Sequence, residues 1–409
     1  MKKISLLFPI LFILVSLTAQ QIPIGAWQEH LSYKNAISVT EGGGMVYCAT
    51  TSGIFSYKKS DNSMTRLSKV NGLSDVEAVV VEYNPYNGKV LIAYKNSNLD
   101  LIEGNNNIIN IPDIKRKSII GNKAINSIYF INQFAYLSCG FGIVVFDTER
   151  NEVKDTYYIG AAGSTVNVRD ITSDGSYLYV ASDNGIYRAL LSNPNLANFN
   201  SWTLINDVAA GINLVAGVYN AITSFNGNIY TNYSKYTMTN AYGEDSLFVF
   251  DGTSWSHFIP SGWGSVSGYI IPSLKTCNNQ LVINREYAIF AFDSGLTGTA
   301  YFSGYFSDQT RANNMVLDNT GAIWIADKKY GLVSWRPGIG YASHVPNGPA
   351  SENVLNMSLS DDQLWVTPGS YGKYLADGLY KFKDEEWSNI KGIPAIDSLY
   401  DFMNVLVDP

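Results

Sequence analysis

Charged side chains are scarce in this chain of 409 residues, at 15% against roughly 25% in typical soluble domains. Basic residues are outnumbered, with 28 Lys and Arg against 35 Asp and Glu, so the formal net charge is −7. The longest basic run is Lys115, Arg116 and Lys117, which is typical of a solvated loop. These shortages exclude a basic nucleic-acid-binding surface, and we expect no nucleic acid among the partners.

Cysteine and histidine are equally rare, and the six residues are Cys48, Cys139, Cys277, His30, His257 and His344. An odd, sparse set of cysteines predicts buried thiols and not a disulfide framework, with a single disulfide as the alternative. None of the histidines has a partner at metal-ligand spacing, so we expect no metal and no cofactor. A calcium site in the turns rich in Asp and Asn is the alternative.

Motifs of catalysis and of phosphate binding are also missing. The sequence contains no G-x-S-x-G, H-E-x-x-H, G-x-G-x-x-G or G-x-x-x-x-G-K-[ST] segment. We therefore expect a protein without catalytic activity. A hydrolase or lyase whose carboxylates converge from distant segments is the alternative, because such convergence leaves no local motif.

Long apolar runs are confined to the N-terminus. Lys2 and Lys3 precede an apolar stretch at residues 4–17, and Ala19 provides a small residue at a cleavage point. This pattern predicts a signal peptide over residues 1–19 and an exported protein, because the run is short for a membrane span. Removing it leaves 26 basic and 35 acidic residues, a balance of −9. The absence of Cys at the cleavage point disfavours a bacterial lipid anchor.

A repeat fills the rest of the chain. Residues 169–187 read as a strand, a turn with Gly, an alternating strand, a second Gly turn and a third strand, and residues 36–57, 126–146 and 314–335 follow the same order. Aligning the middle strands gives eight anchors: Tyr47, Leu91, Tyr136, Tyr179, Tyr230, Val282, Trp324 and Trp365. A fourth strand often follows, as at residues 201–204, 254–258 and 386–390.

Units of about 40 to 50 residues with four short strands are typical of β-propeller blades. One such sheet cannot cover both of its faces, and radial packing of the blades buries them. The chain is therefore predicted to be all-β, with a propeller of four-stranded blades, seven in our preferred interpretation and eight in the alternative. We assign residues 20–350 to this first propeller, with a strand near Trp27 helping to close the ring, and residues 351–409 to the first unit or units of a second, truncated propeller.

Surface aromatic residues in two segments are the candidate ligand-binding residues. Residues 233–242 and 261–269 mix aromatic and polar side chains, a combination that suits sugar rings or protein partners. The candidates are Tyr236, Tyr242 and Trp263. The alternative is that these rings only cover the edges of blades.

Three segments of the sequence, residues 27–36, 46–57 and 66–75, resemble the start of the PorZ family, a component of the type IX secretion system of Bacteroidetes. This resemblance covers nearly the whole mature chain. It implies two seven-bladed propellers, a location at the outer-membrane surface or in the periplasm, and partners of the PorU, PorV and PorQ type. It also implies binding of anionic lipopolysaccharide and its presentation to the sortase.

A second resemblance suggests an alternative function. Single units such as residues 319–335 are similar to the propeller repeats in the sensor regions of two-component regulators. The alternative to a scaffold of the secretion and attachment machinery is therefore the periplasmic ligand-sensing propeller of a hybrid two-component regulator.

Overall fold

The computed structural model describes Gly25 and residues 27–104, 107–208, 210–235, 245–261, 270–372, 374–375 and 377–407. The chain divides into two compact units, Met1–His30 and Leu31–Pro409, and every described strand belongs to the second. The predicted signal peptide lies outside the described residues. Residues 27–30 form no strand, so the strand expected near Trp27 is not observed. In the part of the chain that is described, no helix has the length and apolar character needed to cross a bilayer.

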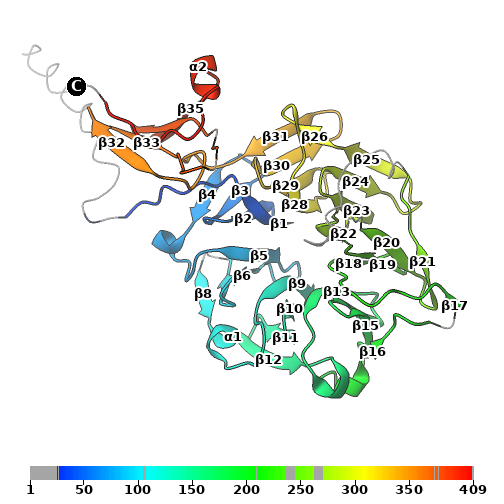
Figure 1. The fold of residues 1–409 in the computed structure, drawn as a ribbon. Helices are drawn as coiled ribbons and strands as arrows, with labels where there is room; N and C mark the ends of the chain where they lie inside the picture. Colours follow the sequence, from blue (N-terminus) through cyan, green and yellow to red (C-terminus); the bar gives the residue numbers. More distant parts are fainter. Residues whose placement is uncertain are drawn as a thin grey trace, which may run out of the picture. The chain divides into compact units, whose positions relative to one another are not determined.

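The first four sheets follow one another along the chain (Figure 1). The first contains β1 (Ala36–Gly42), β2 (Met45–Thr50), β3 (Ile54–Lys58) and β4 (Met64–Leu67), and the second β5 (Ala78–Tyr83), β6 (Val90–Tyr94), β7 (Leu99–Ile102) and β8 (Ile108–Ile111). The third contains β9 (Ile125–Ile131), β10 (Phe134–Cys139), β11 (Gly142–Asp147) and β12 (Glu152–Tyr157), and the fourth β13 (Val168–Ser173), β14 (Tyr177–Ser182), β15 (Gly185–Leu190) and β16 (Thr203–Leu204).

The fifth sheet has an extra outer strand, and a hairpin separates the sixth sheet from the seventh. The fifth contains β18 (Ile222–Phe225), β19 (Asn228–Tyr233), β20 (Ser246–Phe250), β21 (Ser254–His257) and the short parallel strand β17 (Ala210–Gly211). The sixth contains β22 (Ser273–Cys277), β23 (Gln280–Arg285), β24 (Ala288–Phe292) and β25 (Gly298–Phe302); the hairpin is β26 (Gly304–Tyr305) and β27 (Asp308–Gln309). The seventh contains β28 (Ala312–Leu317), β29 (Ile323–Asp327), β30 (Gly331–Arg336) and β31 (Gly340–His344), and the eighth β32 (Asn356–Ser360), β33 (Gln363–Thr367), β34 (Leu379–Lys383) and β35 (Glu386–Ile390).

Helix is scarce in the described residues, as the sequence predicts. Two one-turn helices, α1 (Asp113–Arg116) and α2 (Pro394–Asp397), and three 3₁₀ turns at Lys69–Asn71, Ala161–Gly163 and Phe199–Ser201 are present. The described part of residues 205–217 is a loop with the short strand β17 and no helix. Residues 399–407 form no strand, although their sequence is typical of one.

The first strands of the seven leading sheets contact one another in a closed cycle. β1 contacts β5, β5 contacts β9, and the series continues through β13, β18, β22 and β28 back to β1. Figure 1 shows these sheets arranged around a common centre. All eight aligned anchors lie in the second strand of their sheets, and the predicted fourth strands correspond to β16, β21 and β35. The prediction of an all-β propeller of four-stranded blades is therefore confirmed.

The hydrophobic core is divided among the seams between neighbouring sheets. Seven buried apolar clusters are present in the described residues, and each is shared by two adjacent sheets of the cycle. The seam between the first and seventh sheets contains Phe55 and Trp324, together with Tyr33 from the segment that precedes β1. Cys48 and Cys139 are buried free thiols, and Cys277 is also free, which confirms the prediction for the cysteines.

Candidate functional site in the central channel

The first strands of the seven sheets surround a polar cavity of about 350 Å³. Most of these strands begin with an irregular register: a β-bulge interrupts the pairing of β1, β5, β9, β13 and β28 near the same end. The bulged residues that line the cavity are Ile37, Val79, Asn126, Arg169 and Asn313. Because a bulge leaves one residue without a partner in the ladder and turns its side chain, the repeated bulges direct these five side chains toward the channel.

Asparagine side chains join neighbouring sheets at this end of the channel. Nδ2 of Asn126 donates to the backbone oxygen of Val168 at 2.6 Å, which links the third sheet to the fourth. Nδ2 of Asn313 donates in the same way to the oxygen of Ala36 at 2.7 Å, which links the seventh sheet to the first. In both places the carboxamide of a bulged residue bonds a backbone carbonyl of the neighbouring sheet, directly beside that sheet's own bulge.

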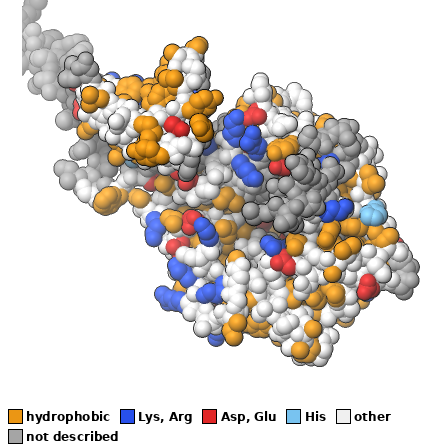
Figure 2. All heavy atoms as spheres, viewed as in Figure 1, with side chains coloured by type: hydrophobic (Ala, Val, Ile, Leu, Met, Phe, Trp, Pro, Cys, Tyr) orange, Lys and Arg blue, Asp and Glu red, His pale blue; other side chains and the backbone are white. Residues whose placement is uncertain are grey.

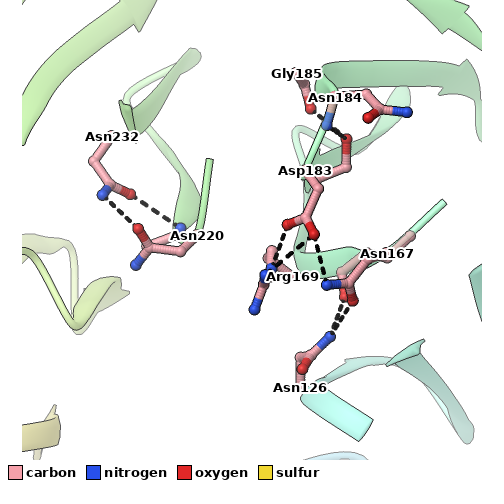
Figure 3. A network of polar contacts seen from close by, with 11 residues as sticks. Asn126, Asn167, Arg169, Asp183, Asn184, Gly185, Asn220 and Asn232 are labelled. Carbon is pink, nitrogen blue, oxygen red and sulfur yellow. Dashed lines mark hydrogen bonds and ion pairs between the residues drawn. The ribbon is translucent and has the colours of Figure 1, made fainter. Parts of the chain in front are cut away.

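The link between the third and fourth sheets extends into a network of polar side chains (Figure 3). Asn126 donates to Oδ1 of Asn167 at 3.0 Å, and Asn167 donates to Oδ2 of Asp183 at 2.9 Å. Arg169 completes the network with two hydrogen bonds to Asp183, at 2.6 and 3.2 Å. A two-point contact between guanidinium and carboxylate fixes the position of both groups. One edge of the channel is thus rigid before any ligand binds.

The fifth sheet provides a second group of fixed amides. Nδ2 of Asn232 donates to Oδ1 of Asn220 at 2.7 Å and to Oδ2 of Asp245 at 2.9 Å, while its own Oδ1 accepts from the backbone of Ala221 at 3.0 Å. Figure 3 shows Asn220 and Asn232 pointing toward each other. Asn220 in turn donates to the oxygen of Ile271 at 2.8 Å, which links the fifth sheet to the sixth.

The carboxyl group of Asp170 is the most strongly perturbed acid of the channel. It accepts backbone hydrogen bonds from Ile171 and, across the seam, from Ile222, both at 3.0 Å. Burial raises the pKa of Asp170 to about 6, although these hydrogen bonds act in the opposite direction. A carboxyl group that titrates near neutral pH can exchange a proton with a bound molecule or respond to its charge.

Lys275 supplies the positive charge of the channel. Its Nζ lies 3.5 Å from Oε2 of Glu82, and Oε1 of the same carboxylate accepts from Thr40 at 2.9 Å. Burial lowers the pKa of Lys275, but the charges of Glu82, Cys277 and Asp170 outweigh it and leave the pKa above its ordinary value. Fixed charges of both signs and several amides therefore line one cavity, which can hold a small polar or charged molecule.

The described lining of the channel lacks the side chains most often used as metal ligands and nucleophiles. It contains no His and no Cys, and no group of three potential metal ligands occurs among the described residues. His257 lies at the outer strand of the fifth sheet against Phe248, at 4.9 Å between ring centroids. His344 lies at the seam of the first and seventh sheets, where its ring centroid is 4.5 Å from that of Tyr57.

The three candidate residues from the sequence, Tyr236, Tyr242 and Trp263, lie outside the described residues and remain predictions. Sequence reasoning did not find the channel residues. A signal for them exists, because alignment of the first strands of the repeat units would place Asn126, Arg169 and Asn313 at equivalent positions. The bulge that gives these positions their direction has no signature in a single sequence.

Comparisons with known proteins agree with this fold. Residues 46–203 match the family described as the N-terminal β-propeller domain of PorZ of the type IX secretion system. The structure of PorZ from Porphyromonas gingivalis superposes with a TM-score of 0.71 at 19% identity, covering 89% of this chain and 46% of PorZ. This chain thus spans less than half the length of that relative. The curated proteins include none that matches the sequence.

Enzymes share the fold as well. A streptogramin B lyase superposes with a TM-score of 0.53 at 12% identity, covering 75% of this chain and 95% of the lyase. An inactive variant of virginiamycin B lyase from Staphylococcus aureus, solved with quinupristin, gives a TM-score of 0.51 at 14% identity, covering 73% and 95%. At such identities the likeness concerns the propeller fold alone.

Proposed function

Because this chain carries a PorZ-type N-terminal β-propeller, which points to a component of the type IX secretion system, we propose that it is a non-catalytic scaffold of that secretion and attachment machinery. In this proposal the protein is exported to the outer-membrane surface or periplasm. It binds anionic lipopolysaccharide and presents it to a sortase, with partners of the PorU, PorV and PorQ type. The match of residues 46–203 to the family is the observation that carries the proposal.

The distribution of charge supports binding of an anionic molecule. At the bulged end of the channel, the described connections of the seven sheets carry eleven basic residues: Lys34, Lys69, Lys95, Lys115, Arg116, Lys117, Lys123, Lys235, Arg311, Lys328 and Lys329. The described acidic residues there number nine: Asp75, Glu77, Asp113, Asp183, Asp207, Asp245, Glu286, Asp308 and Glu352, the last of which bonds the β2–β3 turn. The connections at the other end carry three basic residues, Lys59, Lys89 and Arg150, and seven acidic residues, Asp61, Glu103, Glu149, Asp174, Asp251, Asp293 and Asp318.

The two ends of the propeller therefore differ in sign although the whole chain is acidic. The basic residues are most concentrated in the connection around α1, and Figure 2 shows Lys and Arg side chains gathered over the second sheet. Phosphate and carboxylate groups of lipopolysaccharide are attracted to such a group of cations, and the attraction falls as salt rises. The polar channel between the sheets offers a second contact of suitable chemistry.

We propose that the eighth sheet is the first unit of a second propeller. Its first strand, β32, leaves Met357 and Leu359 exposed at 60% and 74%, whereas the first strands of the other sheets pack against neighbours. Figure 2 shows hydrophobic side chains over this sheet. Met357→Lys should leave the stability of the 409-residue chain within about 0.5 kcal/mol. In a chain to which the further blades of a second propeller are joined, the same change should lower the stability, and equal effects would contradict the proposal.

A capture experiment tests the proposed function. The mature protein is immobilised and exposed to detergent-solubilised outer membrane of its source. The eluate is assayed for lipopolysaccharide and, by mass spectrometry, for a sortase. Recovery of both is expected. The double variant Lys115→Glu with Lys117→Glu should recover several-fold less lipopolysaccharide, whereas Lys58→Glu, at the other end of the propeller, should not. Failure of the folded wild-type protein to retain either would overturn the proposal and favour the sensor alternative.

A further inference from the structure

A groove lined by aromatic and polar side chains lies between the outer strands of the sixth and seventh sheets. Its volume is about 690 Å³, and it is separate from the central channel. Strand β25 provides Tyr301, strand β31 provides Tyr341, and the β26–β27 hairpin provides the third wall with Asp308 and Gln309. Tyr301 and Tyr341 are exposed at 51% and 46%, so both offer a ring to solvent.

A cluster of four rings lies at the groove, and two of them, Tyr305 and Tyr341, line it. The ring of Phe306 lies 4.8 Å from that of Tyr330 and 4.8 Å from that of Tyr341, between ring centroids. Tyr305 is buried below them, within 6.0 Å of Tyr341, and its hydroxyl group donates to the carboxylate of Asp327. Packing and hydrogen bonding therefore hold the ring of Tyr341 in place before a ligand arrives.

The hairpin that brings Phe306 into this cluster has a strained turn. Phe306 and Ser307 have φ values of 55° and 61°, in the left-handed region. Other described two-residue turns with this geometry use small or polar residues, at Gly43–Gly44, Asn226–Gly227, Asn278–Asn279, Asp361–Asp362 and Asp384–Glu385. A bulky residue in this conformation costs about 1 kcal/mol or more, and such strain concentrates at functional positions. This turn places the Phe306 ring in contact with Tyr330 and Tyr341, and these contacts compensate for the strain.

Charged and hydrogen-bonding groups stand beside the rings. Oδ2 of Asp308 lies 2.5 Å from Nζ of Lys329 and accepts from the hydroxyl group of Tyr330 at 3.3 Å. The hydrogen bond from Lys329 and that from the backbone of Gln309 keep the pKa of Asp308 below its ordinary value, so its oxygens are acceptors at neutral pH. One more cation is close by, because the charge of Arg311 also lowers the pKa of Asp308.

We propose that this groove binds a saccharide that carries negative charge. A sugar ring has an apolar C–H face that packs on an exposed tyrosine, and hydroxyl groups that bind Asp308, Gln309 and neighbouring serines. The lining consists of aromatic rings, short polar side chains and one glycine, and it contains no aliphatic side chain. Lys329, which is paired with Asp308, and Arg311, whose charge acts on Asp308, place positive charge beside the groove for an anionic substituent such as a phosphate or a uronic carboxylate.

This inference rests on the proposed function for the source of the saccharide, which would be the glycan of lipopolysaccharide. The two are tested together by titrating the mature protein with intact lipopolysaccharide and with its polysaccharide released from lipid A by mild acid. Calorimetry gives the Kd for each probe. We expect Tyr341→Ala to weaken binding of both probes by about fivefold, because a stacked ring contributes about 1 kcal/mol. Gln309→Ala, which leaves the ring cluster intact, should weaken both by several-fold.

The control is Tyr86→Ala, which removes another exposed tyrosine, in the β5–β6 turn of the second sheet, and should change neither Kd. If both probes bind and neither Tyr341→Ala nor Gln309→Ala changes their Kd, the groove is not the binding site. The proposed function would still stand. Binding of lipopolysaccharide without binding of the free polysaccharide would also rule out the groove as the binding site and leave the proposed function standing. Binding of the polysaccharide alone, weakened by both variants, would support the groove and contradict the proposed function, and binding of neither probe would overturn both.

Discussion

The ammonium nitrogen of Lys59 lies 3.2 Å from Oδ2 of Asp318, and the two residues are 259 positions apart in the chain. Lys59 follows the third strand of the first sheet, and Asp318 follows the first strand of the seventh. The ion pair therefore joins the two ends of the cycle of sheets. Burial alone would raise the pKa of Asp318, but hydrogen bonds from Thr320, Trp324 and Lys59 lower it to about 2. The carboxylate is thus ionised and fully enclosed.

Lys59→Met should destabilise the propeller by about 3 kcal/mol, because it leaves the buried charge of Asp318 without its partner. The matched control is Lys58→Met, which removes the adjacent lysine. Lys58 pairs with Asp61 at the surface, where both side chains are about half exposed, so its loss should cost at most about 1 kcal/mol. Urea denaturation followed by fluorescence measures both changes. Equal losses for the two variants would show that the ion pair does not hold the seam.

The stability of the fold should decrease between neutral pH and pH 4 because of His344. Its Nε2 lies 2.8 Å from Oγ of Ser334, and burial together with the charge of Arg336 lowers its pKa to about 4 from 6.5. The unfolded chain therefore binds the proton more tightly. The stabilisation is complete above pH 6.5 and is lost as pH falls toward 4, at about 1.4 kcal/mol per unit of pKa difference.

His344→Gln should flatten this dependence, because glutamine can still bond Ser334 and does not titrate. Free energies of unfolding at pH 7, 5.5 and 4.5 provide the measurement, with His257→Gln as the control. A slope that persists in His344→Gln would assign the acid sensitivity to other groups.

The carboxyl group of Asp170 should titrate near pH 6, well above an ordinary aspartate. Because the folded pKa is raised, the folded state binds the proton more tightly, and the contribution of Asp170 to stability decreases as pH rises from about 3.8 to 6. Carboxyl carbon NMR of the labelled protein gives the pKa directly, and Asp170→Asn identifies the resonance. A midpoint near 4 would show that the channel is better solvated than its geometry indicates.

Asn313→Ala should reduce the free energy of unfolding by about 1–3 kcal/mol, because it leaves the carbonyl oxygen of Ala36 without its cross-seam donor. Asn200→Ala is the matched control. Asn200 is exposed in the long connection of the fourth sheet, so its loss should stay within about 0.5 kcal/mol. The difference between the two variants in thermal denaturation tests whether asparagine links hold the sheets together.

Much of the fold could be predicted from the sequence, because the sequence patterns that specify strands and turns are local. Alternation of apolar and polar residues has the period of a strand, and Asn or Gly marks the tight turns, so the anchor strands around Tyr179 and Trp324 were placed correctly. The expected strand near Trp27 was not found, and the closing seam instead contains Tyr33 from the segment before β1. Apolar pattern alone does not distinguish a strand from an extended segment that packs without a ladder.

The sequence by itself determined the strands, their grouping in fours and the propeller class, because each depends on residues close together in the chain. Only the tertiary structure decided which side chains meet. Asn126, Arg169 and Asn313 reach the channel through bulges, and Tyr301 and Tyr341 line one groove only because the sixth and seventh sheets pack side by side. A shift of one residue in register reverses the direction of a side chain, and the packing that selects the register comes from neighbouring sheets.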